Sequence, residues 1–244
     1  MSALPVPRVE VHASGDELAT HVAGAFLRLV TVRQASGDVP QVALTGGTIA
    51  HKIHREIARL GADSDVDWSR IDFFWGDERF VAADSGDRNA REARAAMLDT
   101  LPVDPARIHE IPSTTDADDV DGAATAYADT VRSIDGGRFD LVMLGVGPDG
   151  HIASLFPGFP QLDVDEIAVG VTGSPKPPPE RISLTFAALN RSRSVWFLVS
   201  GAEKSEAVAR ALAEGTDPHD TPAAGVTGLE ETIWFLDHDS ASHL

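Results

Sequence analysis

The chain of 244 residues carries 38 acidic and 20 basic side chains, which gives a formal net charge of −18, and 43% of its residues are hydrophobic. This composition is ordinary for a globular protein, and the negative charge disfavours binding to nucleic acid or to an anionic membrane. No cysteine is present, which excludes disulfides, thiolate metal ligands and a cysteine nucleophile.

The first elements alternate between strand and helix. Residues 8–12 predict a short strand, and the sequence SGDE at 14–17 has the spacing of a helix N-terminal capping box. Apolar residues at helical spacing then predict an amphipathic helix over 15–35. An apolar strand over 41–45 enters a Gly-Gly turn, and the helix that follows ends at Gly61. These residues predict a strand, turn and helix unit.

The same alternation continues to the end of the chain. The stretch RIDFFWGDERF predicts a strand that ends at Gly76. The remaining pattern predicts helices over 87–101, 119–134 and about 203–214, and strands over 139–147, 167–172, 194–201 and 232–236. Apolar strands separated by helices, with little alternation of polar residues, indicate a mainly parallel sheet covered on both faces. We predict a doubly wound, Rossmann-like α/β fold.

One α/β domain over residues 1–244 accounts for this pattern, because neither an internal repeat nor an interdomain linker is visible. The N-terminus lacks a basic segment followed by an apolar run, and no stretch of about 18 apolar residues occurs. We therefore expect a cytoplasmic protein. The proline-rich segment 172–180 predicts an extended, semi-rigid connection, which is either a plain loop or a rim that positions Arg181.

Ligands of open parallel sheets bind beyond the carboxyl ends of the strands. Four segments at predicted strand ends carry unusual residues: TGGT at 45–48, GDER at 76–79, GVGPDGH at 145–151 and SGAEK at 200–204. If the ligand is an anion, the few Arg and Lys residues near these segments are the ones expected to bind it.

The segments TGGT and SGAEK are candidate anion contacts. Gly46, Gly47 and Thr48 stand where a strand turns into a helix, so that free backbone N–H groups could hold a phosphate. A plain tight turn is the alternative, and the lysine of a P-loop is missing. Lys204 falls in the first turn of a predicted helix, where the dipole opposes a cation by about 0.3–1 kcal/mol. It is either merely solvated or close to a bound anion.

The segment GDER places three charged side chains at the end of a buried strand. An ion pair inside the loop would explain them. Alternatively, Asp77 or Arg79 contacts a substrate.

The segment GVGPDGH ends a buried strand with a histidine. Its glycines match the spacing of a dinucleotide-binding loop, but Pro148 inside the turn and the lack of a following helical pattern argue against a dinucleotide. His151 has an imidazole that can accept a proton near neutral pH, and the flanking glycines allow close approach of a ligand. It is either a general base or a packing residue. Asp149 either orients it or forms an Asx turn.

Other chemistry has weaker support. His51 and His54 share a helical face, but the remaining ligands of a zinc signature are missing, so we predict no metal site. The G-x-S-x-G motif of serine hydrolases does not occur. A hydrolase of this sequence would therefore use water as its nucleophile.

Over nearly its whole length the chain resembles the 6-phosphogluconolactonase family. The resemblance rests on LTGGT, on FFWGDERFVAADSGDRNAREARAAML, on FDLVMLGVGPDGHIASLFPG, on SPKPPPERISLTFAALNRSRSVWFLVSGAEK, and on the closing PAAGV and TIWFLD. The segment SPKPPPERISLT is most similar to actinobacterial members. The chain departs from the family at GGTIA, where many members have a serine or threonine followed by Thr-Pro, and at FVAADS, where a proline commonly follows the valine.

The resemblance implies hydrolysis of 6-phospho-D-glucono-1,5-lactone to 6-phosphogluconate in the pentose phosphate pathway, with no metal or organic cofactor. It implies His151 as the general base. It also implies a small anionic sugar phosphate as the partner of the protein, which we expect to be a monomer or weak homo-oligomer. The residues implied as substrate contacts are Gly46, Gly47, Thr48, Asp77, Arg79, Asp149, Arg181 and Lys204.

Two alternatives share this fold. Glucosamine-6-phosphate deaminases also have an Asp-Gly-His loop, but theirs continues roughly as Phe-Asn-Glu-Pro, whereas this chain continues as ASLFP at 153–157. The missing acidic residue argues against deamination. A sugar-phosphate-binding transcription regulator would carry an added DNA-binding segment, and only about seven residues precede the first predicted strand.

Overall fold

The centre of the molecule is a six-stranded sheet, seen in the computed structural model, which describes residues 5–244. Its strands, in spatial order, are β1 (Arg8–His12), β9 (Glu231–Asp237), β8 (Ser194–Val199), β5 (Leu141–Gly145), β2 (Gln41–Leu44) and β3 (Asp72–Trp75). Each strand runs parallel to its neighbours. The predicted α/β fold with a mainly parallel sheet is confirmed.

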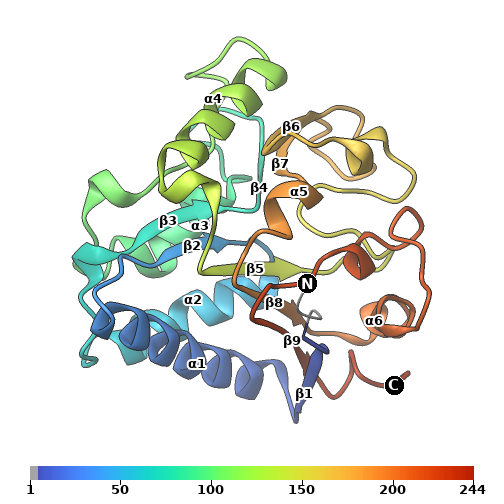
Figure 1. Cartoon of the computed structure of the whole chain (residues 1–244), viewed down its shortest axis with the longest axis horizontal. Coiled ribbons are helices and arrows are strands. Elements are labelled where there is room, and N and C mark those ends of the chain that lie inside the picture. The colour runs from blue at the N-terminus through green and yellow to red at the C-terminus, as the bar shows by residue number, and fades with distance from the viewer. Residues whose placement is uncertain (1–4) are drawn as a thin grey trace.

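Helices lie on both sides of this sheet. They are α1 (Gly15–Ala35), α2 (Thr48–Gly61), α3 (Asn89–Ala93), α4 (Val120–Ser133), α5 (Phe186–Leu189) and α6 (Ser205–Leu212). In Figure 1, α1 and α2 lie below the sheet, and α4 and α5 lie above it. Within residues 5–244, none of the helices combines the length and apolarity needed to cross a bilayer.

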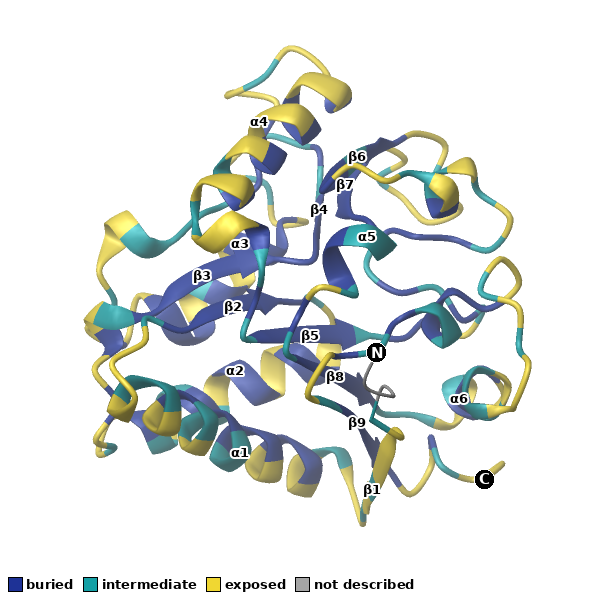
Figure 2. Ribbon diagram, in the orientation of Figure 1, coloured by how far each residue is buried: buried dark blue, intermediate teal, exposed yellow. Residues whose placement is uncertain are grey.

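Burial on both faces explains why the strands lack alternation. Every residue of β2, β3 and β8 is buried, and Figure 2 shows the sheet in dark blue between helices whose outer surfaces are exposed. Phe197 of β8 stacks on Trp234 of β9 with ring centroids 4.0 Å apart. A polar residue inside such a strand would lose its hydration without gaining a partner, so that these strands are apolar after their first residues, Gln41, Asp72 and Ser194.

A second, smaller sheet departs from the prediction. It joins β4 (Asp77–Arg79), β7 (Arg181–Leu184) and β6 (Ala168–Val171) in antiparallel pairs. Three residues of the predicted loop at 76–79, Asp77–Arg79, therefore form a strand, and the predicted strand at 167–172 does not belong to the parallel sheet. The strand at 181–184 has no counterpart in the prediction. The chain leaves β3 at Gly76 because the charges that follow find their partners in the second sheet, as described below.

Two predicted helices are shorter than expected. Over 87–101 the α-helix covers only Asn89–Ala93 and continues as a π-helical segment, Arg94–Leu98, in which Asp99 N–H bonds to the carbonyl of Arg94 at 3.0 Å. Near 203 the chain first forms a 3₁₀ turn, Ala202–Lys204, because Gly201 (φ 108°) starts a tight turn. Lys204 therefore immediately precedes α6 instead of lying in its first turn.

Candidate active site

The candidate site lies where the sheet changes direction. From β2 the chain proceeds through α2 to β3 on one side, whereas from β5 it proceeds to β8 on the other. The loops after β2 and β5 therefore diverge and leave a crevice at the carboxyl ends of the two strands, which is where open α/β sheets bind ligands. A cavity of about 250 Å³ occupies this position, and both loops line it.

Most of the residues predicted to form a site line this one cavity. They are Gly46, Gly47, Thr48, Asp77, Arg79, His151, Arg181 and Lys204. Asp149 is not among the lining residues; it lies behind His151. Two further polar residues that the sequence analysis does not single out, Asn89 and Lys176, also line the cavity. Residues from six separate segments of the chain thus meet at one place.

The loop after β5 holds the imidazole of His151 at the cavity wall. The side chain is 14% exposed, and its ring lies against that of Phe156 with centroids 4.7 Å apart. Gly147 N–H bonds to the carbonyl of His151 at 2.9 Å, which closes the loop tightly. A Cβ atom at Gly147 would lie 2.0 Å from Cε1 of His151, so that only glycine leaves room for the imidazole.

Asp149 is bonded to His151 through both backbone and side chain. One carboxylate oxygen accepts a hydrogen bond from the backbone N–H of His151 at 3.2 Å, and the same oxygen contacts Nδ1 of the imidazole. Both predicted roles of Asp149, the Asx turn and the contact with the histidine, are thus present in the geometry. Burial alone would raise the pKa of Asp149, but hydrogen bonds from His151 and the charges of His151 and Lys176 outweigh it and lower the pKa to about 2.

The loop after β2 presents the N-terminus of α2 to the cavity. Gly47 adopts φ 102°, and no side chain caps the helix, so that N–H groups of the first turn are left for a ligand. A Cβ at Gly46 would lie 1.9 Å from Oδ1 of Asn89. The glycine therefore allows Asn89 to approach the loop, and this amide oxygen has no hydrogen-bond partner within residues 5–244.

Asp77 of β4 and Arg181 of β7 both line the cavity and form an ion pair there. Ser154 Oγ donates to Oδ2 of Asp77 at 2.7 Å, and Nη1 of Arg181 lies 4.0 Å from the same oxygen. The remaining guanidinium N–H groups donate to carbonyls of the proline-rich loop, including that of Lys176 at 3.1 Å. The proline-rich segment thus wraps around Arg181. The ion pair forms between strands, not inside the GDER segment.

Arg79 lines the cavity from the end of β4. Its Nη1 donates to the carbonyl of Asp87, while Nε is buried without a hydrogen-bond partner among the described residues. A buried donor without a partner is costly, about 1–3 kcal/mol, and an anion in the cavity would satisfy it.

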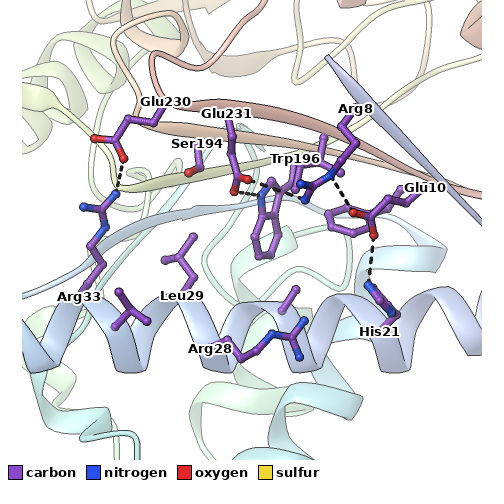
Figure 3. Close-up of a pocket in the computed structure, with 14 residues that line it drawn as sticks. Arg8, Glu10, His21, Arg28, Leu29, Arg33, Ser194, Trp196, Glu230 and Glu231 are labelled. Atoms are coloured by element: carbon purple, nitrogen blue, oxygen red, sulfur yellow. Dashed lines mark hydrogen bonds and ion pairs between the residues drawn. The ribbon is translucent and has the colours of Figure 1, made fainter. Parts of the chain in front are cut away.

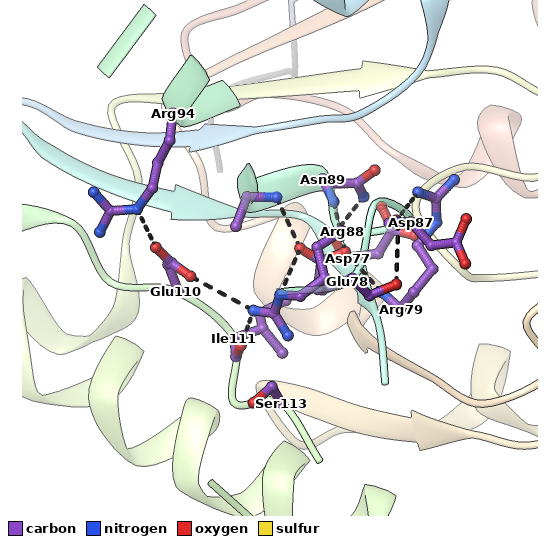
Figure 4. Close-up of polar contacts among 12 residues, drawn as sticks. Asp77, Glu78, Arg79, Asp87, Arg88, Asn89, Arg94, Glu110, Ile111 and Ser113 are labelled. Carbon is purple, nitrogen blue, oxygen red and sulfur yellow. Dashed lines mark hydrogen bonds and ion pairs between the residues drawn. The ribbon is translucent and has the colours of Figure 1, made fainter. Parts of the chain in front are cut away.

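A buried carboxylate behind the cavity organises this wall, as Figure 4 shows. Glu78 is completely buried and accepts backbone hydrogen bonds from Arg79, Asn89 and Ala90, each at 2.8 Å. Burial raises the pKa of Glu78, whereas the Arg88 guanidinium and the three N–H donors oppose the rise. Glu78 therefore joins β4 to the start of α3 and holds Asn89 beside the cavity.

Two lysines complete the wall. Lys204 is half-buried and Lys176 is exposed, and neither ammonium group has a hydrogen-bond or ion-pair partner within 4.0 Å in the part of the chain that the structure describes. Burial lowers the pKa of Lys204, and the like charge of Lys176 lowers it further, against the pull of Glu203 and Asp237. The two cations are close enough to repel each other, and an anion between them would remove the repulsion.

The cavity is strongly cationic in a chain of net charge −18. Its lining holds Arg79, Lys176, Arg181 and Lys204 against a single carboxylate, Asp77. Such a local excess of positive charge overrides the field of the whole molecule and favours an anionic ligand.

The histidines at 51 and 54 lie apart from this site. His51 is exposed on α2, whereas His54 is 3% exposed and faces the core. Burial lowers the pKa of His54 to about 4, so that the ring is neutral at physiological pH.

Comparison with known proteins identifies the family of the chain. A family model described as glucosamine-6-phosphate isomerases/6-phosphogluconolactonase matches residues 13–234. The chain belongs to this family. A family member named 6-phosphogluconolactonase from Streptomyces coelicolor is 40% identical, over 98% of this chain and 95% of the relative.

Solved structures from the family have the same fold. A 6-phosphogluconolactonase from Thermotoga maritima superposes with a TM-score of 0.84 at 28% identity, over 95% of this chain and 99% of the other. A monomeric glucosamine-6-phosphate deaminase superposes with a TM-score of 0.82 at 20% identity, over 97% of this chain and 100% of the other, and at that identity the likeness concerns the fold alone. Because one fold serves both reactions, the choice between them depends on the site.

Proposed function

We propose that the chain hydrolyses 6-phospho-D-glucono-1,5-lactone to 6-phosphogluconate in the oxidative pentose phosphate pathway, with His151 as the base that activates water. The observation that carries the proposal is the meeting of an oriented imidazole and four cationic side chains at one cavity. The 40% identical relative named 6-phosphogluconolactonase supports the choice of substrate. We also retain the prediction of a single α/β domain that works in the cytoplasm as a monomer or weak homo-oligomer.

The contact with Asp149 assigns the protons of the imidazole. A carboxyl group with a pKa of about 2 is ionised at neutral pH and only accepts hydrogen bonds. The Nδ1–H of neutral His151 therefore donates to Asp149, which leaves the lone pair on Nε2. Asp149 thus acts as a positioning residue, and Nε2 is the atom that accepts a proton.

In the proposed reaction His151 acts first as a base toward water and then returns the proton to the ring oxygen of the lactone. As a water oxygen bonds to C1 of the lactone, Nε2 of His151 accepts a proton from the water, and a tetrahedral intermediate forms. The bond between C1 and the ring oxygen breaks next, and the proton on Nε2 passes to that oxygen, which becomes the hydroxyl of the open-chain acid. General base catalysis of this kind contributes about 10²- to 10⁴-fold in rate.

The cationic wall, which is the part of the cavity lining formed by Arg79, Lys176, Arg181 and Lys204, holds the substrate in position for this attack. The phosphate is assigned to Lys204, Lys176 and Arg79, together with the N-terminus of α2. Anchoring the phosphate holds C1 near the imidazole and converts a bimolecular encounter into a positioned one. Arg181 contributes charge, but its N–H groups mainly hold the proline-rich loop.

The residues after His151 favour lactone hydrolysis over deamination. Ala153 lines the cavity, and the buried Ser154 donates its hydroxyl to Asp77. Among the described residues, Asp77 is the one carboxylate that lines the cavity, and it is held by Ser154 and Arg181. A free carboxylate for the acid–base steps of a deaminase is therefore missing from this lining.

The test compares two substrates on the unmodified protein. Freshly prepared lactone is followed by acid release in a pH-stat, with spontaneous hydrolysis subtracted, and glucosamine 6-phosphate is followed by ammonia release. We expect lactone hydrolysis well above the uncatalysed rate and no ammonia. Ammonia release without lactone hydrolysis would favour the deaminase, and binding of both sugars without turnover would favour a regulator.

A further inference from the structure

A second cavity, of about 560 Å³, lies between α1 and the edge of the six-stranded sheet. It shares no lining residue with the candidate active site. Figure 3 shows that its polar side chains are mostly paired, as Arg33 is with Glu230, at 2.7 Å. At one end Glu10 of β1 faces His21 of α1, as Figure 3 also shows, and His12 belongs to the same cluster of side chains.

The local fold brings these three side chains together. Glu10 and His12 are two residues apart on β1, so that they point to the same face of the strand. Ser14 then caps α1, with Glu17 N–H bonded to its hydroxyl at 3.2 Å, and the chain turns back sharply. The first turns of α1 therefore pass over this face and place His21 opposite Glu10, with Oε2 and Nε2 separated by 3.1 Å.

The three possible ligand atoms lie close together, and one of them lacks a hydrogen-bond partner among the described residues. One ligand atom from each of the three residues lies within 4.8 Å of the others, and the two imidazole centroids are 4.6 Å apart. Nε2 of His12 is buried and has no hydrogen-bond partner among residues 5–244. A buried ring nitrogen in this state lacks the partner that a metal ion would supply.

We propose that Glu10, His12 and His21 bind a divalent transition-metal ion of the zinc type. Two imidazoles and one carboxylate are a ligand set that zinc accepts, with the fourth position left to water. Tetrahedral bonds of about 2.0–2.2 Å place ligand atoms about 3.4 Å apart. Rotation of the side chains is enough to bring the three ligand atoms from within 4.8 Å of one another to this separation. The adjoining groove leaves an entry path, because Glu10 and the 44% exposed His21 line it.

The surroundings support the same ion class. Arg8 Nε lies 2.9 Å from Oε1 of Glu10 and orients the carboxylate, which leaves Oε2 for the metal. Phe235 lies beside both imidazoles, with centroids 6.3 Å from His12 and 6.0 Å from His21. Imidazole ligands suit zinc or nickel better than magnesium or calcium. Such an ion would fasten the edge strand β1 to α1.

The experiment titrates metal into the full chain, freed of any histidine tag and treated with a chelator. We expect one Zn²⁺ per chain by calorimetry, a Co²⁺ absorption band of tetrahedral intensity, and a rise in the melting temperature with Zn²⁺ but not with Mg²⁺. His21→Ala, at an exposed position, should weaken binding by about tenfold or more, and so should His12→Ala and Glu10→Gln.

The matched control is His51→Ala, which removes an exposed histidine outside the cluster and should leave Zn²⁺ affinity unchanged. The proposal is overturned if the unmodified chain binds no Zn²⁺, or if His21→Ala and Glu10→Gln bind it as tightly as the unmodified chain. It is equally overturned if His51→Ala alone abolishes binding, because the metal would then sit on α2.

Discussion

Replacing Gly147 by alanine tests the geometry of the His151 loop with a single methyl group. The added Cβ would lie 2.0 Å from Cε1 and 2.1 Å from Nδ1 of His151, and 2.6 Å from the carboxylate of Asp149. The backbone itself accepts alanine, because Gly147 does not have a positive φ. The imidazole must therefore move, and the contact between His151 and Asp149 must break or shift.

The size of the effect follows from that displacement. Ordinary contact of a Cβ begins at 3.4 Å, so that the ring atom at 2.0 Å must retreat by about 1.4 Å. A misplacement of about 1 Å costs about 10²-fold in rate. We therefore expect kcat to fall by about 10²-fold, which corresponds to about 2.7 kcal/mol of transition-state stabilisation.

The assay is lactone hydrolysis in a pH-stat, with melting temperature measured in parallel. Gly86→Ala is the matched control, since nothing lies within 4 Å of its added Cβ and its φ is not positive. We expect the control to keep its activity. A Gly147→Ala variant with kcat within about twofold of the unmodified protein would refute the argument that this loop positions the imidazole.

Two further predictions concern the cationic wall and the buried histidine. Lys204→Ala should raise KM about tenfold or more at nearly constant kcat, since a hydrogen bond to a charged group contributes about 1.5–3 kcal/mol; an unchanged KM would remove Lys204 from the phosphate contacts. The pKa of His54 is about 4 in the folded chain against 6.5 ordinarily, so that the unfolded chain takes up a proton first as pH falls. His54 should therefore contribute about 3 kcal/mol to the loss of stability between pH 6.5 and 4, measured by urea unfolding, and the loss should be smaller by about that amount in His54→Leu; an equal loss in the variant would contradict it.

Local patterns were enough to predict the parallel sheet. The strand over Gln41–Leu44 and the helix after it follow from apolar runs, glycine turns and helical spacing, all of which lie within a few residues of each other. The capping box at 14–17 forms as its spacing predicts. Strands buried on both faces leave a continuous apolar signature that survives in the sequence.

The second sheet could not be predicted in the same way. The residues of β4 are charged, and they form a strand only because Ser154 and Arg181, far along the chain, provide partners for Asp77. The place of Asn89 at the cavity could not be predicted for a similar reason, because it depends on the carboxylate of Glu78. Lys176 lies in a proline-rich loop whose course is set by hydrogen bonds from Arg181. Contacts distant in sequence decide each of these positions.

The most direct test of the account is the effect of His151→Ala on lactone hydrolysis, with kcat and KM determined separately on freshly prepared substrate. If Nε2 of His151 activates water, kcat falls by about 10²-fold or more, while KM and the melting temperature stay close to those of the unmodified protein. A variant that retains the full kcat would contradict the assignment of His151 as the base.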